Sequence, residues 1–347
     1  MALKKNSEST SISKPEHKRK QIPSIDELFH GIQKGDKTAL ARAITLVESS
    51  NAEHLAKANL IVEKCLNQNK KTLRIGITGV PGVGKSTFIE ALGKKLTSLG
   101  KKVAVLTVDP TSSQSKGSIL GDKTRMYELA KDPNAFIRPS PSSESLGGVA
   151  RKTRETIILC EAAGYDVVLI ETVGVGQSET MVHSMVDFFL LLKLAGAGDE
   201  LQGIKRGIIE MADALVINKA DGENIRSAAI AKQDFSKALH LFPLKESGWK
   251  PEVLTCSALE NKGITEVWEF IEKFFELTTS NGYFEKNRRK QNKNWLLQYI
   301  DNRITTDFYQ HPQVAHALPS VINEVTQGTT SPFTAAEKLI KAYKAQK

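Results

Sequence analysis

The sequence contains few cysteines and no long apolar run. Its three cysteines, Cys65, Cys160 and Cys256, are far apart and odd in number, and no Cys-x-x-Cys pair occurs. This scarcity argues against a disulfide-linked scaffold and favours a reducing compartment, so we expect a cytoplasmic protein. No uninterrupted apolar stretch approaches the roughly 20 residues that a membrane helix needs. The first residues lack the apolar core of a signal peptide, and we expect no membrane partner.

Aromatic residues make up only 6% of the chain, although its formal net charge of +9 could suggest a nucleic-acid partner. No segment interleaves aromatic and basic residues in the way that single-strand binders do. The first 20 residues are serine-rich and polar, and carry six basic and two acidic side chains. We expect residues 1–23 to be a disordered basic tail, and we predict no nucleic-acid partner. A mitochondrial targeting signal fits this tail less well, because the tail contains acids and lacks an amphipathic face.

Short apolar segments alternate with helical stretches through the middle of the chain. Several of these segments are apolar on both faces, as expected when helices cover both sides of a parallel sheet. The sequence therefore predicts an α/β fold, a doubly wound and mainly parallel sheet, over residues 71–278. The expected strands are 73–78, 103–108, 166–170, 187–192, 214–218 and 251–256.

Helical arms are expected on both sides of this core. In the N-terminal arm, residues 24–70, we predict two helical segments with apolar faces. These faces are Leu28, Ile32, Leu40, Ile44 and Val47 in one segment, and Leu55, Val62 and Leu66 in the other. In the C-terminal arm, residues 279–347, an i, i+4 stripe is formed by Leu296, Ile300, Ile304 and Phe308, with Trp295 and Tyr299 beside it. A final helix is expected over 333–345. The arm could pack on its own core, but we favour contact with a second subunit in a homodimer.

The first predicted strand runs into "GVPGVGKST" at positions 79–87, which has the pattern Gly-x4-Gly-Lys-Ser. Its glycines allow backbone N–H groups to turn inward around phosphate oxygens, and the positive end of the following helix faces the same anion. We expect Lys85 to reach the β- and γ-phosphates and the Ser86 hydroxyl to ligate Mg²⁺. The predicted nucleotide-binding residues are Gly79, Val80, Pro81, Gly82, Val83, Gly84, Lys85, Ser86 and Thr87.

Two later strand ends indicate which base is bound. The segment "VINKAD" at 216–221 contains Asn-Lys-x-Asp. The carboxylate of Asp221 can accept from both the N1–H and the amine of guanine, a donor pair that adenine lacks. Asn218 can bond the other edge of the base, and the stem of Lys219 can cover its face. In "TCSALE" at 255–260, the backbone N–H groups of Ser257 and Ala258, next to Leu259, could reach the guanine oxygen. The sequence therefore predicts GTP rather than ATP.

The segment "ETVGVGQSE" at 171–179 follows a further apolar strand. Glu171 ends that strand facing the phosphate loop, a position from which an acid can hold Mg²⁺ directly or through water. Gly174 would let its N–H approach the γ-phosphate. Val175 stands where many nucleotide hydrolases have a glutamine that orients the attacking water, and valine cannot hold a water.

The attacking water must therefore be handled elsewhere. Asp109 follows strand 103–108 at the same edge of the sheet and could orient or deprotonate it. Asp122 could complete the Mg²⁺ shell, Arg125 could neutralise phosphate charge, and Gln177 is a further candidate for orienting water. A turn at Asp109 and a solvated loop around Asp122 and Arg125 are the alternatives. The predicted catalytic residues are Lys85, Asp109, Arg125, Glu171 and Gln177, and the predicted metal ligands are Ser86, Asp109, Asp122 and Glu171.

Taken together, these motifs resemble the MeaB/ArgK family of GTPases. The match is carried by "GVPGVGKST", "VDPTSSQSKGSILGDKTRM" (108–126), "ETVGVGQSE", "GDELQGIKRGI" (198–208) and "NKAD". It runs from about residue 25 to beyond residue 300 and includes both helical arms. The resemblance places Asp109, Asp122 and Glu171 around the Mg²⁺–phosphate region, and it implies a protein that works as a dimer.

The human relative in this family serves methylmalonyl-CoA mutase. The resemblance thus implies a GTP hydrolase, using GTP/GDP and Mg²⁺, that loads, protects or reactivates an adenosylcobalamin-dependent acyl-CoA mutase. The family uses the loop at 198–208 to relay nucleotide state to the partner, and we expect Lys205 to be the relay; a solvated lysine is the alternative. Older names in the family suggest another function, an ATP-dependent kinase of periplasmic amino-acid-binding proteins, which the Asn-Lys-x-Asp motif disfavours.

Overall fold

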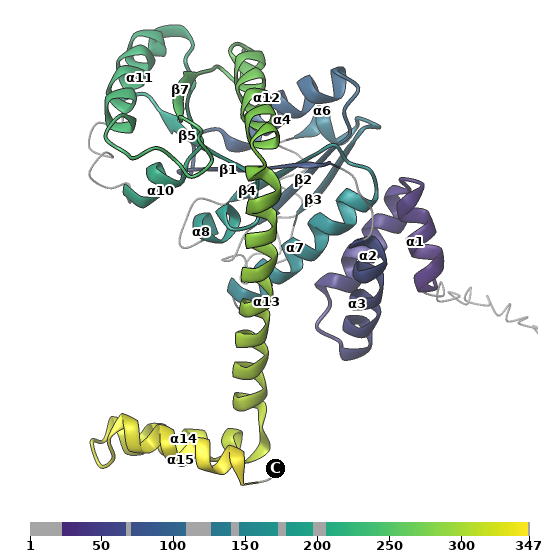
Figure 1. Cartoon of the computed structure of the whole chain (residues 1–347), viewed down its shortest axis with the longest axis vertical. Helices are drawn as coiled ribbons and strands as arrows, with labels where there is room; N and C mark the ends of the chain where they lie inside the picture. The colour runs from purple at the N-terminus through teal and green to yellow at the C-terminus, as the bar shows by residue number, and fades with distance from the viewer. Residues whose placement is uncertain are drawn as a thin grey trace, which may run out of the picture.

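A seven-stranded, wholly parallel sheet forms the centre of the molecule (Figure 1). The computed structural model describes residues 23–66, 71–108, 126–139, 146–172, 178–196 and 206–345. Within these residues the strands follow the order β3-β2-β4-β1-β5-β6-β7. Their bounds are β1 Leu73–Gly79, β2 Val103–Val108, β3 Ala135–Pro139, β4 Val167–Thr172, β5 Phe188–Leu194, β6 Ala214–Asn218 and β7 Glu252–Thr255. The predicted doubly wound α/β core is confirmed.

Strand β3 is the one strand of this sheet that the sequence pattern does not predict. Its segment contains an arginine and ends at Pro139, so it does not read as an apolar run. The strand lies at the edge of the sheet and pairs only with β2, and an edge strand tolerates proline because one side of its backbone needs no partner. Arg138 points away from the core and forms an ion pair with Glu48 of the N-terminal arm.

Helices cover both faces of the sheet, which explains the continuous apolar strands. Along β4, Val167 and Leu169 face one core and Val168 and Ile170 face the other. The first core is closed by α4 (Lys85–Ser98), α6 (Tyr127–Ala130) and α12 (Ile264–Ser280), the second by α7 (Leu146–Ala162), α8 (Ser178–His183) and the N-terminal arm. Helix α10 (Arg206–Met211) packs on β5, and α11 (Ile225–Leu239) packs on β6 and β7. In the described part of the chain, no helix has the length and apolar character needed to cross a membrane.

The N-terminal arm contains three helices where two were predicted: α1 (Ile25–Gln33), α2 (Lys37–Glu48) and α3 (Ala52–Leu66). The apolar face that we assigned to one helix is buried but is divided between α1 and α2. The break lies at Gly35, whose φ of 76° favours glycine, and at Asp36, whose carboxylate accepts a 2.8 Å hydrogen bond from the N–H of Thr38. Glycine and a capping aspartate thus end one helix and begin the next.

The predicted face of α3 is wrong in part. Val62 is buried, but Leu66 is 59% exposed. The buried face consists of Ala58, Ile61, Val62 and Cys65, which follow the i, i+3, i+4, i+7 spacing of a helix surface. Leu66 is one residue beyond that face, so the rotation of 100° per residue turns it outward.

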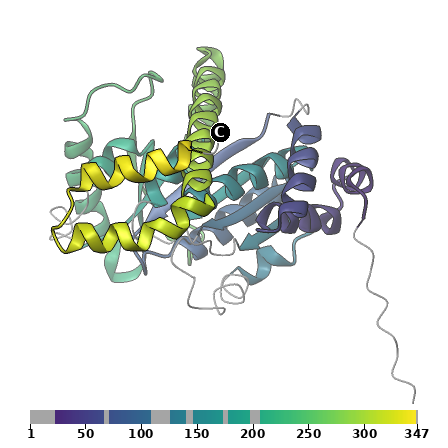
Figure 2. The same cartoon turned by 90° about the horizontal axis from the view of Figure 1, so that it is seen from below.

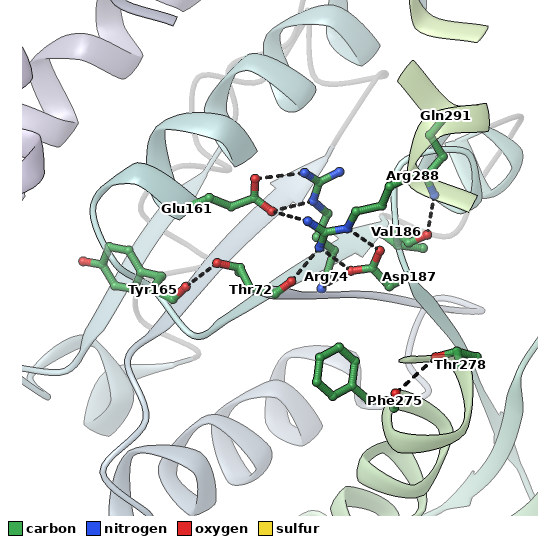
Figure 3. A network of polar contacts seen from close by, with 10 residues as sticks. All are labelled: Thr72, Arg74, Glu161, Tyr165, Val186, Asp187, Phe275, Thr278, Arg288 and Gln291. Carbon is green, nitrogen blue, oxygen red and sulfur yellow. Dashed lines mark hydrogen bonds and ion pairs between the residues drawn. The ribbon is translucent and has the colours of Figure 1, made fainter. Parts of the chain in front are cut away.

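The C-terminal arm leaves the sheet as one long helix, α13 (Tyr283–Gln310). At its far end, α14 (Pro312–Thr326) and α15 (Pro332–Lys344) form a helical hairpin that lies away from the sheet in Figure 1 and whose two helices run side by side in Figure 2. The near end of α13 is anchored by Arg288, whose guanidinium donates to both carboxylate oxygens of Asp187, at 2.9 and 2.7 Å, and to the carbonyl of Thr72 (Figure 3). Gln291 donates to the carbonyl of Val186 at 2.7 Å.

Buried Glu155 on α7 supplies a pH-dependent contribution to stability. Burial raises the pKa of Glu155 to about 6 from its usual 4.5, although Arg151 partly opposes this. Its Oε2 is buried and accepts no hydrogen bond from the described residues. A raised carboxyl pKa gives stability that is present at low pH and is lost as the pH rises through about 6.

We therefore expect Glu155→Gln to stabilise the protein by about 2 kcal/mol more at pH 8 than at pH 4. Urea unfolding at the two pH values measures this difference. Glu63→Gln, at an exposed position on α3, is the matched control and should show no comparable difference. An equal effect of Glu155→Gln at both pH values would contradict the assignment.

Candidate functional site

The motifs singled out from the sequence meet at one edge of the sheet. The phosphate loop follows β1, Glu171 is near the end of β4, Asn218 ends β6, and Ser257 comes soon after β7. Because the strands are parallel, their carboxyl ends lie at the same edge, where doubly wound proteins bind their ligands.

The loop between β1 and α4 is shaped by three glycines with positive φ, namely Gly79 at 155°, Gly82 at 81° and Gly84 at 93°. Gly79 also lies close to its neighbour: a Cβ there would be 2.6 Å from the carbonyl oxygen of Leu192. Lys85 is the first residue of α4, and its ammonium group donates to the carbonyls of Gly79 at 2.8 Å and Val80 at 3.2 Å. The lysine and the start of α4 therefore place positive charge inside the loop.

Ser86 and Glu171 lie together beside the loop. The Ser86 hydroxyl donates to Oε1 of Glu171 at 3.2 Å, and the glutamate is buried. Glu171 is in register with Ile77 of β1, which brings β4 against the strand that leads into the loop. A hydroxyl and a carboxylate are the oxygen donors that Mg²⁺ takes in proteins, so this pair fits the ion.

Asn218 joins the phosphate loop to the segment after β7. It is 1% exposed, and its amide donates to the carbonyl of Val83 at 2.9 Å. Its Oδ1 accepts from the N–H of Ala258 at 3.2 Å and from the thiol of Cys256 at 3.4 Å. Burial raises the pKa of Cys256 to about 12, so the thiol keeps the proton that it donates. These hydrogen bonds let Asn218 position the loop and the segment after β7, while its contact with the base stays a prediction.

Cys256 is the residue of this site that sequence reasoning misses. The motif "TCSALE" drew attention to the residues after the cysteine, and a lone buried thiol carries no signal of its own. Its position one residue before Ser257, at the end of a strand that leads to the base motif, is the only indication available from sequence.

Of the predicted base-recognition residues, Lys219 is exposed and Asp221 is half-buried, whereas Ser257 is buried beside Asn218. Lys219 has a φ of 57° and donates to the carbonyl of Gly82 at 2.9 Å, so it extends over the phosphate loop. The Asp221 carboxylate accepts a hydrogen bond from the Ser257 hydroxyl, which joins the two base motifs. Leu259 is exposed, and so are Pro81 and Thr87 on the loop and at the start of α4.

Seven of the residues singled out from sequence lie outside the described residues: Asp109, Asp122, Arg125, Gly174, Val175, Gln177 and Lys205. Their assigned roles therefore stay predictions. The described site comprises the phosphate loop, the Ser86–Glu171 pair, the Asn218 bridge and the Asp221–Ser257 pair.

This fold and this site define a P-loop GTPase. The chain belongs to the MeaB family: the family model described as "Methylmalonyl Co-A mutase-associated GTPase MeaB" matches residues 40–313. This match confirms the resemblance noted in the sequence. Guanine-nucleotide binding and GTP hydrolysis are the activity of this class.

Relatives and a solved structure support the same assignment. A putative GTPase of Caulobacter vibrioides is 50% identical over 319 residues, which are 92% of this chain and 98% of the relative. The "Methylmalonic aciduria type A homolog, mitochondrial" of Mus musculus is 46% identical over 332 residues, covering 93% of this chain and 80% of the relative. The crystal structure of a LAO/AO transport system kinase superimposes with a TM-score of 0.73 at 40% identity, covering 91% of this chain and 96% of that one.

Proposed function

We propose that this GTPase is a chaperone for an adenosylcobalamin-dependent acyl-CoA mutase of the methylmalonyl-CoA mutase type. It gates the loading of the cofactor into that mutase, and it protects or reactivates the mutase. The observation that carries the proposal is the family match over residues 40–313, which spans the whole nucleotide site and all of α13. The alternative is a kinase of amino-acid-binding proteins, in line with the name of the LAO/AO relative. The Asp221–Ser257 pair speaks against it, because a carboxylate at this position suits guanine and not adenine.

In this proposal the nucleotide is bound along the edge of the sheet. Lys85 and the start of α4 bind the β- and γ-phosphates, and Asp221 accepts from the N1–H and amine of guanine. The N–H groups of Ser257 and Ala258, which the sequence assigns to the guanine oxygen, donate instead to the Lys262 carbonyl and to Asn218 Oδ1, so we do not propose them as donors to the base; Lys219 covers the base. Asn218 keeps the loop and the base motif at a constant separation through its bonds to Val83 and Ala258.

Hydrolysis requires charge stabilisation and an oriented water. Ser86 and Glu171 would hold Mg²⁺, which would neutralise phosphate charge when bound. We propose Asp122 as a further ligand, Arg125 as a neutralising charge, and Gly174 as an N–H donor to the γ-phosphate. Asp109 is proposed both as a ligand of Mg²⁺ and as the residue that orients the attacking water. Gln177 is the second candidate for orienting the water, because the side chain of Val175 cannot do so. A site of this kind hydrolyses GTP slowly until a partner supplies what it lacks.

The test is a steady-state GTPase assay with and without a cobalamin-dependent acyl-CoA mutase from the same cell. We expect the mutase to accelerate hydrolysis of GTP, and ATP to remain a poor substrate. Lys205→Ala should keep the basal rate and lose most of the acceleration, since this residue is proposed to relay nucleotide state. Lys237→Ala, on the exposed side of α11, is the control that should respond as the wild type does. No acceleration of the wild type by the mutase would contradict the proposal.

We also propose that the protein is a homodimer formed through α13. Three apolar side chains along one side of that helix are largely exposed: Leu296 at 59%, Ile300 at 41% and Ile304 at 60%. Phe308, which extends the same stripe in sequence, packs instead with Val314 and Val321 in the small core of the α14–α15 hairpin. The stripe is therefore shorter than the sequence suggests, and it needs a second surface to leave water.

The double variant Ile300→Asp, Ile304→Asp should weaken self-association by at least about 100-fold, because two carboxylates would have to be buried in the interface. Light scattering across a dilution series measures this. Thr305→Asp, on the opposite side of α13 by helical geometry, should leave association unchanged. Point variants are preferable to deletion of α13, since Arg288 bonds buried Asp187 and its removal would leave that carboxylate unpaired. A wild-type chain that is monomeric at micromolar concentration would contradict the dimer.

A further inference from the structure

A cavity of about 720 Å³ lies at the edge of the sheet opposite the nucleotide site. It is bounded by the end of α3, by α7, by the residues after α8, and by the first half of α13. Arg74, the second residue of β1, lies at its floor, so the cavity is beneath the amino ends of the strands whose carboxyl ends carry the phosphate loop. None of the described residues of the nucleotide motifs contributes to it.

Among the described residues of the cavity wall, basic side chains outnumber acidic ones by five to two. Two of the basic groups are neutralised by neighbouring carboxylates. Arg74 forms a two-pronged ion pair with Glu161, at 2.7 and 2.9 Å, and Arg288 binds Asp187 in the same way (Figure 3). The other basic groups, Lys71, Arg154 and Arg289, have no ion pair within the described part of the chain.

Arg154 is the unusual member of this group, because it is only 7% exposed. Its guanidinium donates to Oε1 of Gln298 at 2.9 Å and to the hydroxyl of Ser184 at 2.8 Å, and both acceptors are neutral. Burial lowers the pKa of Arg154, as expected for a cation that is removed from water without a counter-ion. Two of its five N–H donors are used, so donors remain for an anion. A buried, uncompensated charge is costly unless something supplies the opposite charge.

Apolar side chains also line this wall. Ile158 on α7, Met185 after α8, and Trp295 on α13 line the same space as Arg154. We propose that this cavity binds a small amphipathic organic anion, whose phosphate or carboxylate is bonded by Arg154 and whose apolar part packs against Ile158, Met185 and Trp295. Lys71 and Arg289 are exposed at the rim, where they attract an anion to the entrance.

The proposed ligand joins elements that the nucleotide does not touch. It contacts Ser184 and Met185, which follow α8, and it contacts α13, which carries the exposed stripe toward the hairpin. It would therefore strengthen the attachment of α13 to the sheet beyond what Arg288 and Gln291 provide.

The experiment uses the full chain saturated with GDP, so that the phosphate loop does not take up the probe. Octyl phosphate and octanoate are titrated by calorimetry and by the change in tryptophan fluorescence, which Trp295→Phe should remove. Inorganic phosphate and 1-octanol test each half of the ligand alone and should bind at least about 10-fold more weakly. The better of the two octyl compounds identifies phosphate or carboxylate as the natural group.

Arg154→Gln should weaken the better probe by at least about 10-fold, the loss typical for a charged hydrogen bond, while Arg154→Lys should weaken it less. Arg151→Gln, one turn away on α7 and outside the cavity, should have no effect. Binding that is unchanged in Arg154→Gln, or absent from the wild type at 1 mM probe, would overturn the proposal. A purely structural Arg154 would lower the unfolding temperature on replacement without changing affinity. GTP hydrolysis and its response to a mutase test the proposed function separately and do not depend on this result.

Discussion

Replacement of Asp221 by asparagine is expected to lower GTP affinity by at least about 100-fold and to create affinity for xanthosine triphosphate. In the proposed contact the Asp221 carboxylate accepts two hydrogen bonds from guanine. An asparagine would offer one acceptor and one donor, and the donor would face the guanine amine and leave that N–H unpaired. Xanthine carries an oxygen where guanine carries its amine, so the same amide donor becomes complementary. The hydrogen bond from Ser257 to Asp221 keeps the side chain oriented toward the base, which makes the exchange effective.

Competition between labelled GTP and unlabelled GTP, ATP or xanthosine triphosphate measures this change. Glu223→Gln removes an exposed carboxylate two residues away and should leave the order of affinities unchanged. The base assignment predicts that the gain for xanthosine triphosphate accompanies the loss for GTP. A loss for all three nucleotides together would indicate damage to the fold instead.

Gly84→Ala should abolish binding of GTP and GDP alike, with a loss of at least about 100-fold. The residue has a φ of 93°, where an L-residue is strained by roughly 1–2 kcal/mol. A Cβ there would also be 2.7 Å from the amide nitrogen of Asn218, which must then move and release its bond to Val83. Since the same asparagine holds Ala258, the disturbance reaches both the phosphate loop and the base motif.

Gly82→Ala is the matched control for this variant. Its φ of 81° is equally unfavourable, but a Cβ there meets no atom within 4 Å. Its loss of affinity should therefore stay within about 30-fold, the effect of backbone strain alone. Titration of the two variants with fluorescent GDP measures their affinities and separates the effect of backbone strain from that of the steric clash with Asn218. Equal losses in both would contradict the bridging role of Asn218, and circular dichroism would show whether either variant fails to fold.

The nucleotide site is largely predictable from sequence because each of its parts is local. A phosphate loop is nine consecutive residues, and each base motif is a short run at a strand end. The parallel sheet then places all strand ends at one edge, so motifs far apart in the chain can be assigned to one site without coordinates. The apolar strands were equally predictable from the sequence, since burial on both faces requires uninterrupted apolar runs. Edge strand β3, which is covered less completely, lacks that pattern.

Contacts between side chains that are remote in sequence cannot be predicted in this way. Asn218 has the residue type expected of a base contact, yet its partners Val83 and Ala258 are revealed only when three loops are brought together. Phe308 fits an exposed stripe by spacing, but the turn into α14 places it in a separate small core.

By itself, the sequence determined the α/β core, the phosphate loop, the preference for guanine and the family, because local patterns of backbone and side-chain chemistry specify them. Only the tertiary structure decided that Asn218 links two loops, that α13 is anchored by Arg288, and that Arg154 is a buried cation facing a cavity without a carboxylate partner in the described chain. The physical reason is that burial and ion pairing depend on the distances between segments. The sequence shows which side chains are charged, but the packing of α7 against α13 and the sheet determines which of these charges are neutralised.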